Sequence, residues 1–235
     1  MLVDRYAVNL RAPLGRRGVL GGGLGLAGLL VLPACTTTSG LGEYFYVDAV
    51  RRLLEASTRN AFARLTAPEG FWDSAVARIE LPVLFGKRGS VMEGILRSPA
   101  FRERLQHRLN IIAEDGARAA APVVADTVRT IGIENAYALI TGEPSAATTF
   151  LRAQMGAALV NAMIPELQDI MRITSDPLVN QALSLLAGVD VAQAAHALAL
   201  EADNAIWYEI GAEEAAIRRD PGKSGDPVLK RVFGG

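Results

Sequence analysis

The sequence predicts an all-α protein, a single domain of packed and partly kinked helices that form an irregular bundle without a substantial sheet. Apolar residues recur at spacings of three and four, and helix start and stop signals separate the segments. No stretch alternates polar and apolar residues for long enough to predict a strand. Beyond residue 34, the remaining 201 residues are enough to bury about 70% of the unfolded surface in one core.

The first long helix is predicted over residues 43–65. Its apolar face consists of Val47, Val50, Leu54, Ala61, Phe62 and Leu65. The breakers Pro68 and Gly70 end this helix. Residues 79–85 are predicted as an extended connector, because Pro82 disfavours helical backbone in the residue before it.

Caps and breakers mark five further helices. They are predicted over residues 99–130, 134–140, 145–174, 178–187 and 191–219. Ser98 and Asp190 are the clearest N-caps, since proline follows the serine and Gln193 stands three residues after the aspartate. Pro122 and Pro165 should bend the helices that contain them.

Residues 1–34 are predicted to be a lipoprotein signal peptide that ends at Leu32-Pro33-Ala34-Cys35. The basic residues Arg5, Arg11, Arg16 and Arg17 precede an apolar run over residues 18–34 with six glycines. This run is too short for a convincing membrane span and fits a removable signal. Cys35, the only cysteine, is then the lipid attachment point. The alternative is a cysteine buried as a small hydrophobic residue.

The adjacent Arg16 and Arg17 resemble a twin-arginine export signal, with the general secretory route as the alternative. Residues 35–42 should form a flexible tether, and residues 43–235 the helical domain. The expected location is therefore the periplasmic face of a bacterial membrane, inner or outer, with the chain held by its lipid anchor.

Charge argues against nucleic acid as a partner. After residue 34 the chain has 20 basic and 24 acidic residues, whereas phosphate binding needs a basic surface. Residues 51–129 hold 13 basic and 9 acidic residues, and residues 130–217 hold 2 and 11. The two segments would attract each other if they packed together, or they are two solvated faces of different composition.

Several motifs resemble those of one bacterial family. They are Glu69-Gly70-Phe71 with Ile79-Glu80-Leu81-Pro82, the segment 146–152, Glu213-Glu214 with Ile217-Arg218, and the ending 228–234. Together they are similar to DUF4197, a domain of unknown function. The resemblance implies an exported helical protein, often with a lipoprotein signal, and no assigned activity. The sequence departs from the family pattern at Ile111, where arginine is expected, and looks shortened between residues 174 and 191.

No catalytic, metal or cofactor site is predicted. Glu103 and His107 are one helical turn apart, but two ligands do not make a metal site. Asp203, Glu209 and Glu213 could serve acid–base chemistry, yet an acidic outer face of the last helix is the favoured interpretation.

A polar network is predicted from Arg152, Glu213, Glu214 and Arg218. Glu214 and Arg218 are one turn apart with the acid nearer the N-terminus, which is the favourable order. Arg152 is expected to meet the Glu214 carboxylate and so to join two of the family-like motifs.

The function favoured by the sequence is a lipid-anchored module that docks on another envelope protein. The alternative is a carrier of a small hydrophobic or lipid ligand, and an enzyme acting on an envelope polymer comes third. Residues that suggest a carrier are Phe150, Met155, Met163, Met171, Trp207 and Tyr208, because such side chains can line adaptable cavities. The sequence leaves the oligomeric state open.

Overall fold

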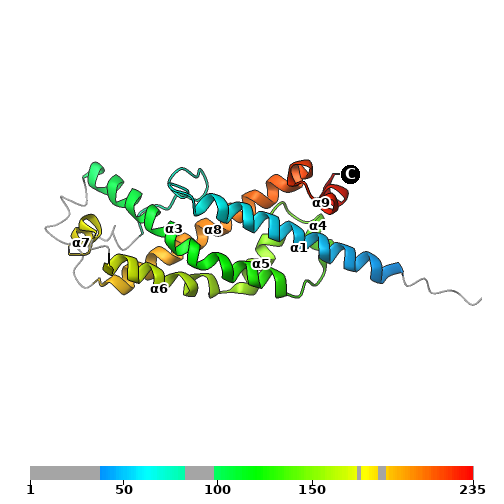
Figure 1. The fold of residues 1–235 in the computed structure, drawn as a ribbon, viewed down its shortest axis with the longest axis horizontal. Coiled ribbons are helices and arrows are strands. Elements are labelled where there is room, and N and C mark those ends of the chain that lie inside the picture. The colour runs from blue at the N-terminus through cyan, green and yellow to red at the C-terminus, as the bar shows by residue number, and fades with distance from the viewer. Residues whose placement is uncertain (1–37, 83–97, 174–175, 185–188, 235) are drawn as a thin grey trace, which may run out of the picture. The chain divides into compact units, whose positions relative to one another are not determined.

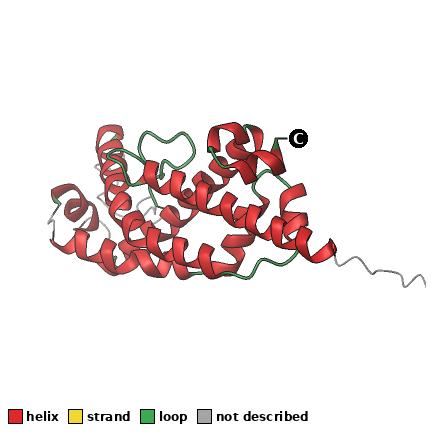
Figure 2. Cartoon of the chain, turned by 45° about the vertical axis from the view of Figure 1, so that its right-hand side comes forward, coloured by secondary structure: helices red, strands yellow, loops and turns green. Residues whose placement is uncertain are grey.

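The computed structural model describes residues 38–82, 98–173, 176–184 and 189–234. The regular elements of these residues are all helices (Figure 2), which confirms the predicted all-α class. In chain order they are α1 (Thr38–Leu65), α3 (Pro99–Thr130), α4 (Ala136–Thr141), α5 (Ala146–Met155), α6 (Ala158–Ile173), α7 (Pro177–Ser184), α8 (Val191–Arg219), the 3-10 helix η2 (Pro221–Ser224) and α9 (Pro227–Phe233). None of the described helices has the length and hydropathy that a bilayer span requires.

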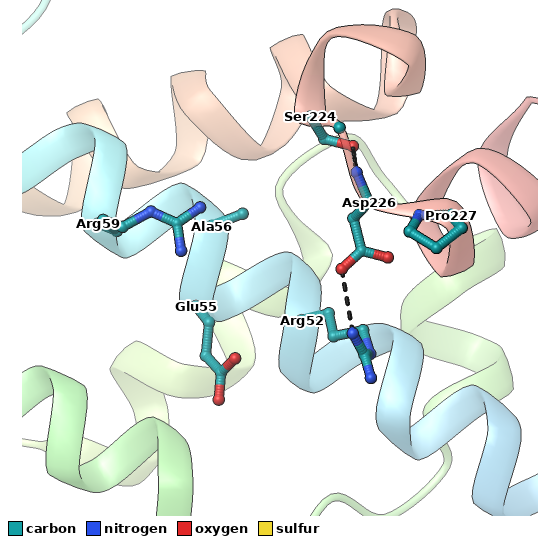
Figure 3. Close-up of a pocket in the computed structure, with 8 residues that line it drawn as sticks. Arg52, Glu55, Ala56, Arg59, Ser224, Asp226 and Pro227 are labelled. Carbon is teal, nitrogen blue, oxygen red and sulfur yellow. Dashed lines mark hydrogen bonds and ion pairs between the residues drawn. The ribbon is translucent and has the colours of Figure 1, made fainter.

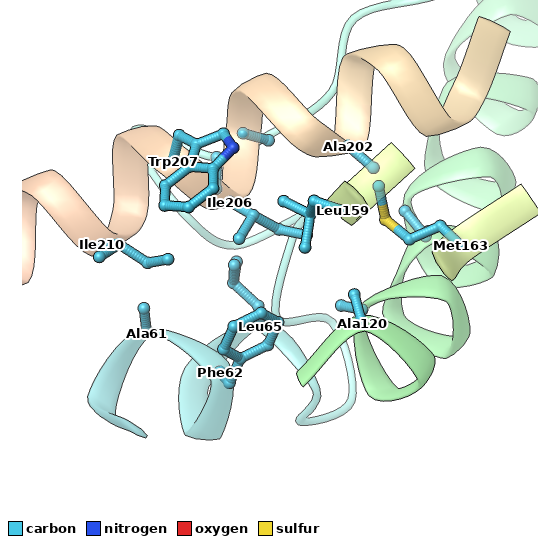
Figure 4. Packing of buried hydrophobic residues seen from close by; sticks show 14 of the residues in the cluster. Ala61, Phe62, Leu65, Ala120, Leu159, Met163, Ala202, Ile206, Trp207 and Ile210 are labelled. Carbon is cyan, nitrogen blue, oxygen red and sulfur yellow. The ribbon is translucent and has the colours of Figure 1, made fainter. Parts of the chain in front are cut away.

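The long helix α8 packs against α1, α3, α5 and α6, and α3 in turn packs against α1 and α6 (Figure 1). Their apolar faces meet in one core (Figure 4). The labelled core residues are Ala61, Phe62, Leu65, Ala120, Leu159, Met163, Ala202, Ile206, Trp207 and Ile210. Met155 and Met171 are buried in the same cluster. These methionines therefore fill the core, which removes them as evidence for a carrier.

Small residues set the distance between helices. A side chain at Gly116 of α3 would place its Cβ 2.9 Å from the Leu167 side chain of α6, so glycine allows these helices to approach closely. On α8 the buried positions include Ala194, Ala195 and Ala199, whose small side chains leave room for neighbouring helices.

Local signals predicted several helix ends correctly. α1 ends at Leu65, and α3 spans Pro99–Thr130 as expected. α8 begins with the predicted capping box, in which the Asp190 carboxylate accepts a hydrogen bond from the Gln193 amide at 2.8 Å. Ser98 is the N-cap residue of α3, but its side chain makes no capping hydrogen bond.

Two boundaries differ from the prediction. The helix expected over residues 145–174, with a bend near Pro165, is instead divided at Gly156 into α5 and α6, and Pro165 lies inside α6. Gly156 has a φ of 52° and a ψ of −121°, a positive-φ conformation that glycine adopts at little cost because it has no Cβ atom. α1 begins at Thr38, so residues 38–42 are helical although a tether was predicted there.

A tight turn after α1 folds the chain back towards α3. A Cβ atom at Gly70 would lie 2.2 Å from the Arg64 carbonyl oxygen, which only glycine avoids. The following connector is pinned to α3 because the Asn110 amide accepts from the Ile79 N–H at 2.8 Å and donates to its carbonyl at 2.9 Å. Residues 83–85 of the predicted connector lie outside the described residues.

Candidate functional site

A groove of about 700 Å³ lies between α1 and α3. It is lined by Glu55, Thr58, Arg59, Phe62, Ala63, Thr66, Arg118, Ala121, Ala125, Val128 and Arg129. Phe62, Val128 and the three alanines give it an apolar floor. Its volume lies within the range of small-molecule sites, roughly 300–1,000 Å³.

One hydroxyl beside this groove has no partner among the residues that the structure describes. Thr58 is only 4% exposed, and its Oγ1 atom is buried without a hydrogen bond to the described residues. Other hydroxyls nearby bond to the carbonyl four residues earlier, as Ser57 and Thr66 do at 2.7 Å each. An unpaired buried polar group costs about 1–3 kcal/mol. The Oγ1 atom itself is closed off from the groove, so the penalty falls on the helix packing beneath the lining.

Three arginines surround the apolar floor. Arg118 and Arg129 each form an ion pair with an aspartate three residues earlier on α3. Both pairs are exposed, and such pairs are worth about 1 kcal/mol or less, so an incoming anion can compete for them. Arg59 makes no hydrogen bond or ion pair with the described part of the chain. Glu55 is the only acidic residue in the lining. The groove therefore suits a ligand with an apolar body and an anionic group.

A smaller pocket of about 280 Å³ adjoins the groove and shares Glu55 and Arg59 with it (Figure 3). Arg52 crosses this pocket to Asp226 at 3.2 Å. Burial tends to raise the pKa of Asp226, but the amides at the start of α9 and the Arg52 guanidinium outweigh it and hold the pKa below its usual value. Arg52 and Asp226 thus neutralise each other in this pocket.

The predicted polar network forms in part. Glu214 is fully buried on α8 and accepts hydrogen bonds from the Ala147 and Thr148 amides at 3.1 and 2.7 Å and from the Thr148 hydroxyl at 2.6 Å. Arg218 donates to the same carboxylate at 2.7 and 2.9 Å. Arg218 also donates to the Leu139 and Ile140 carbonyls at 2.7 Å each. The Glu214–Arg218 pair therefore joins α4, α5 and α8.

The expected contact between Arg152 and Glu214 is wrong. Arg152 instead donates to Asp203 at 3.0 Å and to Asn204 at 2.5 Å. The first amides of α5 already hold the Glu214 carboxylate, and a helix N-terminus attracts an anion. Arg152 lies one turn further along α5 than Thr148 and meets an earlier part of α8. Burial raises the pKa of Asp203, while Trp207 and Arg152 oppose the rise.

The acidic residues of α8 do not form an outer face as predicted. Glu209 is fully buried, and it accepts hydrogen bonds from Arg64 at 2.5 Å and from Ser74 at 2.9 Å. Arg64 also binds Glu213 at 2.5 Å. The prediction failed because α8 is packed by α1 and three other helices. Arg64 belongs to the basic segment 51–129, and Glu209 and Glu213 belong to the acidic segment 130–217. Opposite charges of the two segments therefore attract where α1 packs against α8.

His107 has a different partner from the one considered. Its Nε2 atom lies 2.6 Å from a Glu69 carboxylate oxygen, and its ring packs edge-on against Trp72 at 4.8 Å. Glu103 is exposed. Within residues 38–82, 98–173, 176–184 and 189–234, no group of three or more His, Cys, Asp or Glu side chains is arranged to hold a metal ion.

Sequence reasoning missed the groove because its floor is mostly alanine, and alanines carry no motif. The predicted lipidation and export residues Cys35, Arg16 and Arg17 lie outside the described residues.

The helices define an all-α domain whose buried acids are mostly held by its own arginines and amides, with a groove beside them. The chain belongs to the DUF4197 family, described as a protein of unknown function, whose family model matches residues 41–234. This confirms the family resemblance. No curated protein and no solved structure matches the chain.

Proposed function

We propose that this protein is a lipid-anchored envelope protein that binds an anionic amphiphile in the groove between α1 and α3. The amphiphile has an acyl-like apolar chain and a carboxylate or phosphate head. The observation that carries the proposal is an apolar groove of ligand-sized volume with three arginines at its rim and one acid, Glu55, in its lining. The anchor at Cys35 and the periplasmic location are the part of the proposal that comes from the leader sequence.

The groove favours a carrier over the docking module that the sequence preferred. It extends from Glu55 to Thr66 along α1, which is about 16 Å at 1.5 Å per residue. This length and the volume suit one small molecule, whereas a standard protein interface buries about 800 Å² on each partner. The acids most suited to catalysis, Asp203 and Glu209, are held by arginines in the core, and this weighs against the enzyme alternative.

The test is a binding titration of the purified full chain with oleate, lysophosphatidic acid and oleyl alcohol. Oleate and lysophosphatidic acid each have an acidic headgroup that can pair with the arginines of the groove, whereas oleyl alcohol has none. We therefore expect at least one of the two acids to bind about tenfold or more tighter than oleyl alcohol. The comparison of oleate with lysophosphatidic acid separates a carboxylate head from a phosphate head.

A variant pair locates the binding. Ala125→Phe fills the groove and should abolish binding, whereas Ala119→Phe changes an equally half-buried alanine of α3 that does not line the groove. Equal binding by both variants, or equal affinity for all three probes, would contradict the proposed site.

A further inference from the structure

A cluster of aromatic side chains lies at the N-terminal end of α1. It consists of Phe45 and Tyr46 of α1 and Tyr137 of α4, and together with the exposed Tyr44 of the same turn of α1 we name it the aromatic end. The rings of Phe45 and Tyr46 are 5.9 Å apart, and those of Tyr46 and Tyr137 are 5.5 Å apart. Tyr44 and Tyr137 are 78% and 61% exposed, which is unusual for such large side chains. Each of these two rings therefore meets the solvent.

Basic groups flank the aromatic end. The Arg231 guanidinium of α9 lies 5.5 Å from the Phe45 ring centroid, and its neighbour Lys230 is exposed. Glu43 is the exposed acid next to Tyr44. Tyrosines with an apolar ring and a polar tip are enriched where protein meets the lipid headgroups. Lysine and arginine beside them add attraction to anionic lipids, about 1 kcal/mol for each charge near the surface.

The chain length ties this cluster to the predicted lipid anchor. Only three peptide units separate Cys35 from Thr38, where α1 begins, and these can span at most about 10 Å. Six further residues of helix lead to Tyr44 and add about 9 Å. An acyl chain on Cys35 would therefore hold Tyr44 within about 20 Å of its attachment point.

We propose that the aromatic end is a membrane-docking surface, with Tyr44 inserted among the headgroups of the bilayer that holds the anchor. The proposal rests on the anchoring part of the proposed function and is independent of ligand binding. Docking at this end fixes how the domain stands on the bilayer, because the contact adds a second attachment to the acyl chains.

The experiment places a fluorescent reporter at the aromatic end of the full chain. Tyr44→Trp and, as a matched control, Tyr208→Trp are each reconstituted in vesicles of phosphatidylglycerol and phosphatidylcholine with brominated acyl chains. Tyr208 is an exposed tyrosine of α8, with 64% of its surface accessible. It lies ten residues before Arg218, the residue of α8 that contacts α4, and it is not part of the aromatic end. Bromine quenches tryptophan only at short range, so the fluorescence of each variant is read against wild type, whose Trp72 and Trp207 give the background.

Docking predicts that brominated lipid quenches the residue introduced at position 44 at least twofold more than that at position 208. Equal quenching at the two positions, or none at either in protein that sediments with the vesicles, would overturn the docking surface. Failure of the full chain to sediment with vesicles would instead overturn the anchor in the proposed function. Neither outcome depends on whether the groove binds oleate.

Discussion

The polar groups of α8 and those of the groove between α1 and α3 differ in whether they have partners. Glu214 and Glu209 are fully buried, and each is held by an arginine and further donors. In the groove, by contrast, the Thr58 hydroxyl is buried and unpaired while Arg59 is left without a partner among the described residues. Removing one member of a satisfied buried group is costly, whereas the exposed Arg59 can bind an anion without breaking a contact with the described residues. The comparison separates residues that hold the fold from residues available for binding.

The largest effect is expected at Glu214. Glu214→Ala should lower the free energy of unfolding by about 3–5 kcal/mol, because it leaves the nearly buried Arg218 and the Thr148 amide without their acceptor. Urea denaturation of the two proteins measures this. Glu166→Ala is the control, since Glu166 is exposed on α6 and its loss should stay within about 0.5 kcal/mol. Similar small losses for both would show that the Glu214 contacts do not stabilise the fold.

The next effect concerns the turn that follows α1. Gly70→Ala would force a Cβ atom against the Arg64 and Leu65 carbonyl oxygens, both of which are backbone atoms. We expect a loss of about 2–3 kcal/mol in thermal unfolding. Gly132→Ala is the matched control because no atom lies within 4 Å of its added Cβ. A loss that is no larger for Gly70→Ala than for Gly132→Ala would contradict the close approach.

The local part of this fold could be predicted from the sequence, and the long-range part could not. Asp190 and Gln193 signal a helix start within four residues, so the start of α8 was found. Gly156 was missed because a single glycine can also stand inside a helix, and tertiary packing decides whether its backbone takes a positive φ instead. Arg152 and Glu209 were misassigned because their partners are about 50 and 145 residues away in sequence. Only the Glu214–Arg218 pair, one turn apart, was readable on its helix.

A pH effect is expected at Glu114, a buried acid of α3. Burial raises its pKa, Arg118 and the Glu69 and Gly70 amides oppose the rise, and its Oε1 atom has no hydrogen-bond partner among the described residues. A raised pKa in the folded protein means that stability is greatest below the unfolded pKa and is lost as pH rises through the folded pKa.

Glu114→Gln should therefore stabilise the protein at pH 7 by about 1 kcal/mol, the order of an unpaired buried polar group. The gain should disappear near pH 3, where the carboxyl is protonated in both states. Melting temperatures of both proteins across this range provide the measurement. A gain that does not change with pH would rule out ionisation of Glu114 as its cause.

The smallest effect compares two adjacent hydroxyls of α1. Thr58→Val removes an unpaired hydroxyl and should leave the free energy of unfolding unchanged or raise it by up to about 1 kcal/mol. Ser57→Ala removes a hydroxyl bonded to the Leu53 carbonyl and should lower it by about 1 kcal/mol. Chemical denaturation of both variants tests this. Equal losses would mean that Thr58 is already satisfied in the free protein.

Native mass spectrometry of the full chain, released from its own membrane in mild detergent, tests the central claim most directly. The proposal predicts that wild type carries one bound acidic amphiphile, which collisional activation releases as an anion. Ala125→Phe should carry none because the new ring occupies the groove. A wild-type protein without any bound amphiphile, or the same bound amphiphile on Ala125→Phe, would contradict a ligand site between α1 and α3.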